Sequence, residues 1–249
     1  MEAVLATIAL VPGLAVGSFL GVAAARVPLR RSVVRPGSAC MSCARPIRWF
    51  DNVPLVSYAL LRGRCRHCGA RIPPRDPAIE IATALLLSGC VLAFGLTLQA
   101  AAAATCCAGL VVATATDLER RIIPNRVVLP AAVVVLVLRT AADPSPEWTL
   151  GALGAAGVLF VAAAAYPGGM GMGDVKLALL IGAMLGRTSA VALMLAVLLA
   201  FVPSVALLLR HGSRARKLAI PFAPFLSSGA VVAIFAGERL LNGYLGVLT

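Results

Sequence analysis

Residues 81–116, IATALLLSGCVLAFGLTLQAAAAATCCAGLVVATAT, contain no Asp, Glu, Lys or Arg. About 20 apolar residues are enough to cross the hydrocarbon core of a bilayer. A charge-free run of 36 residues is therefore too long for one ordinary span. The run predicts a helical hairpin in a membrane, with its turn near Gly95 to Gln99.

Similar stretches occur along the whole chain, which is 60% hydrophobic and only 13% charged, where a soluble domain carries about 25% charge. We expect an all-α polytopic membrane protein of about eight transmembrane helices. They are expected at 3–25, 77–97, 99–117, 126–142, 149–166, 174–186, 189–209 and 221–244. The segment 174–186 is the shortest, and Pro167-Gly168-Gly169 before it predicts a flexible loop.

Basic residues are unevenly distributed and predict the orientation. Residues 26–75 hold 11 of the 22 Lys and Arg but only one acid, Asp51. With the N-terminus outside, 19 basic residues lie in inner loops and three, Arg139, Arg187 and Arg239, lie outside. Basic loops mark the cytoplasmic face. The formal charge of +12 is thus explained by topology and contact with membrane lipids, and we expect no nucleic-acid partner.

Between the first two helices lies a loop rich in Pro, Arg and Cys. The chain is accordingly divided into a first helix (1–25), this loop (26–76) and a helical core (77–249). Two C-x2-C pairs in the loop fit a structural zinc site of four thiolates, Cys40, Cys43, Cys65 and Cys68. A disulfide pair, free thiols or His67 as a replacement ligand are the alternatives. Cys90, Cys106 and Cys107 lie in apolar runs, where packing is expected.

Two aspartates stand where helices meet one membrane face. Asp117 ends one apolar segment and Asp174 begins another. Acids at the edge of a membrane are costly and indicate function, and a convergent pair can share one proton and activate water. Gly171 and Gly173 would let the backbone approach an extended substrate.

Each of these acids, taken alone, also fits a structural role. Asp174 fits a helix N-cap, and Asp117 can pair with Arg120 or Arg121. For the whole chain, a proton-coupled transporter and a zinc-stabilised membrane scaffold are the alternatives to an enzyme. Within a catalytic dyad, the helix dipoles favour Asp174 as the base and Asp117 as the acid.

Several ordered motifs resemble those of the type IV prepilin peptidases. The matching motifs are Gly17-Ser18-Phe19-Leu20, Asp51-Asn52-Val53-Pro54, the two cysteine pairs, Pro77 with Glu80, Asp117-Leu118 followed by Ile123-Pro124-Asn125, Gly171-x-Gly173-Asp174-Val175-Lys176-Leu177, and Pro221-Phe222-Ala223-Pro224-Phe225-Leu226. The chain differs from the family pattern at Gly21 and Ala25, where the family usually has Asn and Tyr.

This resemblance implies an aspartic protease of the G-x-G-D type in the bacterial cytoplasmic (inner) membrane, with Asp117 and Asp174 as its catalytic pair. Gly171, Gly173, Lys176 and Glu80 would support the substrate or the loops. The enzyme would remove a basic leader from prepilins or pseudopilins at the cytoplasmic face. It would then methylate the new amine with S-adenosylmethionine, for which no binding residues can be assigned.

Overall fold

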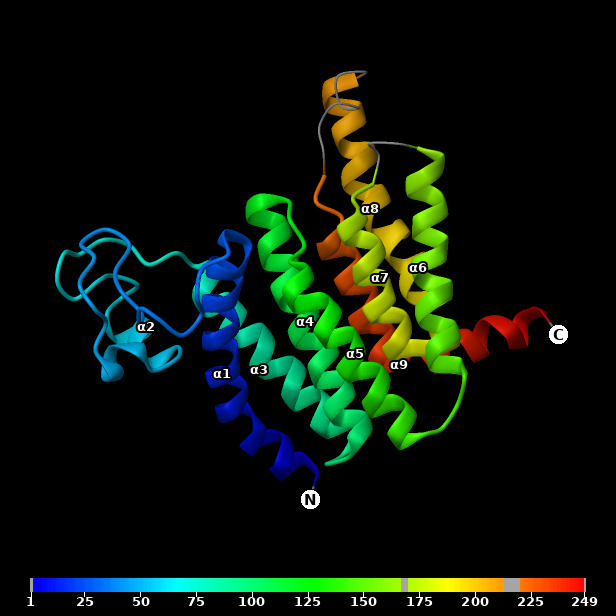
Figure 1. The fold of residues 1–249 in the computed structure, drawn as a ribbon, viewed down its shortest axis with the longest axis horizontal. Coiled ribbons are helices and arrows are strands. Elements are labelled where there is room, and N and C mark those ends of the chain that lie inside the picture. Colours follow the sequence, from blue (N-terminus) through cyan, green and yellow to red (C-terminus); the bar gives the residue numbers. More distant parts are fainter. Residues whose placement is uncertain (1, 167–169, 213–219, 249) are drawn as a thin grey trace. The chain divides into compact units, whose positions relative to one another are not determined.

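The computed structural model describes residues 2–166, 170–212 and 220–248, and in these ranges every regular element is a helix (Figure 1). The helices are α1 (Glu2–Arg26), η1 (Val27–Leu29), η2 (Trp49–Asn52), α2 (Val56–Leu60), α3 (Arg75–Phe94), α4 (Leu98–Arg120), α5 (Asn125–Ala142), α6 (Glu147–Ala165), α7 (Met172–Leu185), η3 (Gly186–Thr188), α8 (Ser189–His211) and α9 (Ala223–Leu248). The predicted all-α fold is confirmed. The predicted loop at 167–169 and the basic residues Arg214, Arg216 and Lys217 lie outside the described residues.

Seven stretches of the described chain are long and apolar enough to cross a membrane. The longest, Met172–Arg210, has 39 residues and contains α7, η3 and α8. The eight expected helices therefore correspond to α1 and α3 to α9, with two of them in one continuous apolar stretch. The break expected near Gly95 to Gln99 falls between α3 and α4, where Gly95 adopts a positive φ of 65°.

The chain divides into two compact units, Met1–Leu96 and Thr97–Thr249. In the first unit, α1 and α3 pack closely because α1 has glycines at the contact. A Cβ on Gly13 would lie 2.8 Å from Ala84 Cα, and one on Gly17 would lie 2.6 Å from Glu80 Cα. The guanidinium of Arg26, the last residue of α1, donates hydrogen bonds to the carbonyl oxygens of Ser32, Pro36 and Gly37 at 2.7–3.2 Å. These bonds fix the start of the cysteine loop to the end of the helix.

The second unit is a bundle of α4 to α9 in which α7 is buried. Except for the partly exposed Leu179, its residues from Leu177 to Leu185 are buried against neighbouring helices. Fourteen residues span only about 21 Å, which is short for a membrane helix, but α7 is surrounded by protein instead of lipid. Glycines allow the close approach of α6, since a Cβ on Gly151 would lie 2.5 Å from Gly186 Cα.

Cys90, Cys106 and Cys107 are completely buried in α3 and α4. The prediction that these three cysteines pack in the helical interior is therefore confirmed.

Candidate active site and cysteine cluster

Asp117 lies one turn before the end of α4 and is 7% exposed. Its Oδ2 accepts a hydrogen bond of 3.0 Å from the backbone N–H of Ala223. Ala223 is the first residue of α9, so the first free N–H group of that helix is satisfied by the carboxylate. The bond joins residues 106 positions apart and holds the carboxylate at one end of the bundle.

Asp174 is the third residue of α7 and is 9% exposed. Its Oδ2 accepts a 3.3 Å hydrogen bond from the Gly171 N–H, and its own N–H donates to the Gly171 carbonyl oxygen at 3.0 Å. This reciprocal pair is the backbone version of a capping box. The capping role considered for Asp174 is thus correct in part: the residue caps α7, but from its third position.

The two aspartates converge in the structure. Asp117 near the end of α4 and Asp174 near the start of α7 are carried by helices that pack against each other. The loops beside them also touch, because a Cβ on Gly173 would lie 2.9 Å from Ile123 Cβ. Since Ile123 follows α4, this contact brings the segment after Asp117 onto the start of α7.

A second contact joins the same two motifs. Lys176 Nζ donates a hydrogen bond of 3.0 Å to Asn125 Oδ1. Lys176 is on the first turns of α7 and Asn125 is the first residue of α5. The hydrogen bond of the lysine therefore connects the two loops. Both residues belong to the ordered motifs found in the sequence.

The ion pair that the sequence allowed between Asp117 and a neighbouring arginine is not among the described ion pairs. Among these described pairs, none joins Asp117 to Arg120 or Arg121. The sequence did not indicate that α9 would direct its N-terminus at Asp117. Because both carboxylates receive an N–H from a helix start, the dipole argument no longer separates an acid from a base.

The four predicted metal ligands meet in the first unit. The Sγ atoms of Cys40, Cys43, Cys65 and Cys68 all lie within 4.8 Å of one another, and those of Cys40 and Cys68 are 3.7 Å apart. A tetrahedral site with Zn–S bonds of about 2.3 Å has edges of about 3.8 Å. The donors therefore fit a four-thiolate metal site, and His67 is not among them.

Each cysteine pair occupies the same kind of turn. The Ala44 N–H donates to the Cys40 carbonyl oxygen, and the Gly69 N–H donates to that of Cys65. Both Ala44 and Gly69 have positive φ, 53° and 69°. The two turns thus present their thiols to one point.

The thiols of this cluster differ in acidity. The backbone N–H groups of Cys43 and Ser42 lower the pKa of the Cys40 thiol to about 6. The Ala70 N–H lowers the pKa of Cys68, but desolvation and the hydrogen bonds of Cys68 with the other three thiols outweigh it and raise that pKa to about 11. A bound cation would favour release of the remaining protons.

Two further acids support the cysteine loop. The Asp51 carboxylate accepts three hydrogen bonds from the Arg66 guanidinium at 2.6–3.0 Å, and this pairing lowers the pKa of Asp51. Glu80 Oε2 in α3 accepts a 2.9 Å hydrogen bond from the Leu55 N–H. Leu55 has a φ of 56°, so Glu80 stabilises a strained turn before α2.

Comparison with known proteins identifies the family of this chain. Residues 11–94 match the Bacterial Peptidase A24 N-terminal domain, and residues 104–209 match the Type IV leader peptidase family. A prepilin leader peptidase/N-methyltransferase of Bacillus subtilis is 34% identical over 237 residues, which cover 94% of this chain and 95% of the relative. The chain belongs to the prepilin leader peptidase/N-methyltransferase family.

Further relatives with the same name come from Burkholderia pseudomallei and Pseudomonas aeruginosa. They are 34% and 32% identical, with 92% and 97% of this chain and 84% and 93% of the relatives covered. No solved structure matched the chain. Each family segment lies within one of the two compact units. The four clustered cysteines lie in the A24 N-terminal segment, and both aspartates lie in the peptidase segment. The prediction of an enzyme of this family is confirmed.

Proposed function

We propose that the chain is an aspartic endopeptidase that uses Asp117 and Asp174 to cut the basic leader from type IV prepilins or pseudopilins. The observation that carries this proposal is the burial of two carboxylates from separate helices on chain segments that contact each other at one end of the bundle. The family relationship favours peptidase chemistry over the transporter and scaffold alternatives.

In this mechanism the two carboxyl groups share one proton. The ionised group takes a proton from a water molecule, whose oxygen attacks the scissile carbonyl carbon. The protonated group donates to the carbonyl oxygen, giving a tetrahedral diol. A proton then passes to the amide nitrogen and the C–N bond breaks. The products are a leader with a new carboxylate and a mature pilin with a free amine.

The surrounding contacts serve to hold this pair in place. Ala223 positions Asp117, and Gly171 positions Asp174. The Lys176–Asn125 bond and the Gly173–Ile123 contact set the separation of the two loops. The positive-inside rule puts this end of the bundle at the cytoplasmic face of the inner membrane, with the N-terminus outside.

The cysteine cluster would hold a structural zinc ion. Four thiolates leave no open position for a substrate, so the metal would contribute folding energy and no catalysis. The names of the relatives support a second activity, methylation of the new amine by S-adenosylmethionine.

Cleavage of a prepilin by membranes that contain Asp117→Asn or Asp174→Asn tests the proposal. Each change preserves shape and removes the carboxylate, so we expect loss of cleavage with normal expression and metal content. Glu119→Gln is the matched control, because Glu119 is exposed, two residues from Asp117 on the same helix. Near-normal cleavage by either Asn variant would refute the dyad.

A further inference from the structure

The cysteine loop carries a group of exposed apolar side chains that its metal site does not use. Trp49 is 83% exposed, Leu60 is 77% exposed and Val56 is 54% exposed, with Phe50 and Val53 also exposed between them. They come from η2, α2 and the turn that joins these two short helices. We call Trp49, Phe50, Val53, Val56 and Leu60 the interfacial edge.

The interfacial edge is bordered by cations. The Arg48 and Arg66 guanidinium groups each lie 5.7 Å from the centre of the Phe50 ring, and Trp49 packs edge-on against the same ring. The sole acid of residues 26–75, Asp51, is already paired with Arg66. The loop therefore presents apolar side chains within a strongly positive surface.

The depth of this edge follows from the Glu80 hydrogen bond. The Leu55 N–H, between η2 and α2, is bound to Glu80. Glu80 is five residues beyond Arg75, where the α3 span begins, which is about 7.5 Å along the helix. Interfacial helices bury their apolar face about 5–10 Å into the headgroup and acyl boundary. The edge is thus tied to α3 at the depth of that boundary.

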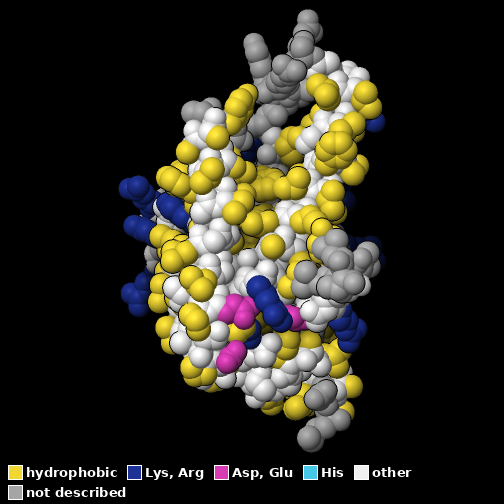
Figure 2. All heavy atoms as spheres, turned by 90° about the vertical axis from the view of Figure 1, so that its right-hand side faces the viewer, with side chains coloured by type: hydrophobic (Ala, Val, Ile, Leu, Met, Phe, Trp, Pro, Cys, Tyr) yellow, Lys and Arg dark blue, Asp and Glu magenta, His cyan; other side chains and the backbone are white. Residues whose placement is uncertain are grey.

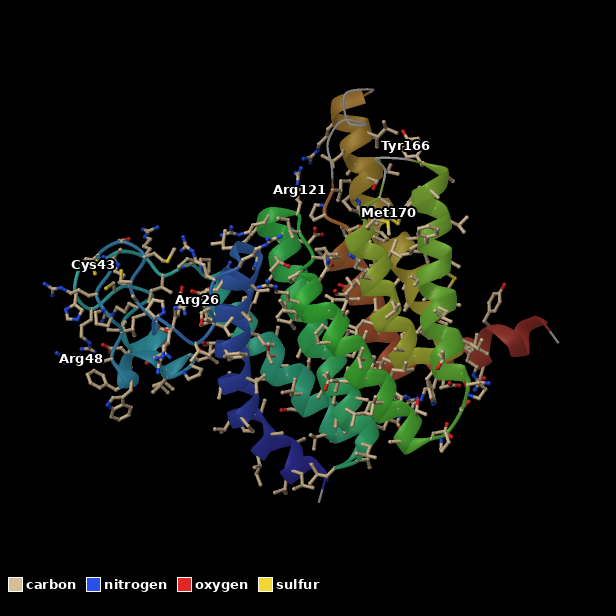
Figure 3. All side chains as sticks on the ribbon, in the orientation of Figure 1. Arg26, Cys43, Arg48, Arg121, Tyr166 and Met170 are labelled. Atoms are coloured by element: carbon tan, nitrogen blue, oxygen red, sulfur yellow. The ribbon has the colours of Figure 1, made fainter. Side chains whose placement is uncertain are left out.

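The placement of labelled side chains agrees with this depth. In Figure 3, Cys43 lies above Arg26 and Arg48 lies below it along the direction of α1. With Arg26 at the cytoplasmic end of the expected α1 span, this placement puts Arg48 on the bilayer side of the loop and the cysteine turn on the side away from it.

We propose that the interfacial edge inserts into the anionic lipid surface of the cytoplasmic leaflet and holds the cysteine loop on the bilayer. Tryptophan favours the membrane interface, and clustered arginines bind anionic headgroups. The basic leader of the proposed substrate has the same sign of charge as the loop, so charge complementarity favours lipid over leader. The inference does not depend on the peptidase reaction.

Tryptophan fluorescence of the full chain in nanodiscs tests this assignment. The chain has two tryptophans, Trp49 and Trp148, so Trp148→Phe leaves Trp49 alone. Where that variant is poorly folded, the difference between wild type and Trp49→Phe reports the same residue. In discs of phosphatidylglycerol and phosphatidylcholine, lipids brominated near the headgroup end of the acyl chain should quench Trp49, and aqueous acrylamide should not.

Matched variants separate the edge from the rest of the loop. Leu60→Gln and Arg48→Gln should each weaken lipid quenching by roughly twofold or more. Met41→Gln should have no effect, because Met41 is 99% exposed but lies in the cysteine turn. Trp49 that is quenched by acrylamide and not by brominated lipid in anionic discs would overturn the proposal. Equal lipid quenching in discs of phosphatidylcholine alone would overturn the assignment to anionic lipid.

Discussion

Gly173→Ala should impair cleavage by moving the Asp174 segment relative to the Asp117 segment. The new Cβ would lie 2.9 Å from Ile123 Cβ, a branched carbon fixed to the backbone, and 3.3 Å from two further carbons of the same side chain. Carbon contacts begin at about 3.5 Å, so the two loops must separate by roughly 0.6 Å or more. Gly173 is helical with an ordinary φ, so the change acts through this contact.

The expected size of the effect follows from this displacement. A misplacement of about 1 Å in an active site can lower the rate about 100-fold, and overpacking costs about 1–3 kcal/mol of stability. We therefore expect kcat for prepilin cleavage to fall by about 10- to 100-fold in a protein that still folds. The assay is single-turnover cleavage in detergent or nanodiscs, with melting temperature measured in parallel.

Two further variants make this test specific. Gly157→Ala adds the same methyl group in α6, where nothing lies within 4 Å, so it should leave kcat unchanged. Ile123→Ala should partly restore the activity of Gly173→Ala, because it removes the two carbons at 3.3 Å. A folded Gly173→Ala variant with wild-type kcat would refute the claim that this contact sets the carboxylate geometry.

Three other changes have defined outcomes. Ala223→Pro removes the N–H that binds Asp117, at a first-turn position that proline tolerates. Because a hydrogen bond to a charged group contributes about 1.5–3 kcal/mol, cleavage should fall by about 10- to 100-fold. Ala223→Ser should remain active as the control, and an active proline variant would contradict this role. Metal analysis of purified protein should find about one zinc ion, which is lost in Cys40→Ser or Cys65→Ser because all four thiolates bind the ion. Reduced protein that is active but contains no metal would count against the site. Mass spectrometry of a pilin matured with S-adenosylmethionine present should find an N-methylated first residue, and complete cleavage with an unmodified amine would reduce the protein to a peptidase.

Charge-free apolar stretches predicted the helices well because lipid-facing and buried helices both exclude charge. The largest error, four residues, is at the end of α9, expected at 244 and found at Leu248. The short helix at 174–186 was difficult to explain from length alone. The structure explains it through burial among neighbouring helices, a property that hydropathy does not report.

The sequence predicted the residues of the candidate site but not the backbone hydrogen bonds that hold them in place. The convergence of Asp117 and Asp174 follows from helix direction, and the four cysteines follow from spacing. The bond from Ala223 to Asp117 joins positions 106 residues apart and uses a backbone group, so no residue type signals it. The Glu80 bond to Leu55 is similar, since its partner is again a backbone N–H.

The sequence also did not predict how charged side chains pair at the other end of the second unit. In Figure 2 acidic and basic side chains gather at the lower end of a hollow with apolar walls. Among the described contacts of this unit, the Arg187 side chain binds Glu238 at 2.9 Å, and its backbone N–H donates to Glu147 at 3.0 Å. These ties between η3, α6 and α9 fix the end of the buried α7, and so help to hold Asp174 at its start.

The most direct test of the account is a double-mutant cycle on the catalytic pair. Prepilin cleavage is measured for Asp117→Asn, for Asp174→Asn and for the double variant, with Glu119→Gln as control. Residues that act as one unit are strongly non-additive, so each single variant should lose nearly as much activity as the double variant. If the two losses multiply, or if one single variant retains most of its activity, the two carboxylates do not form one catalytic pair.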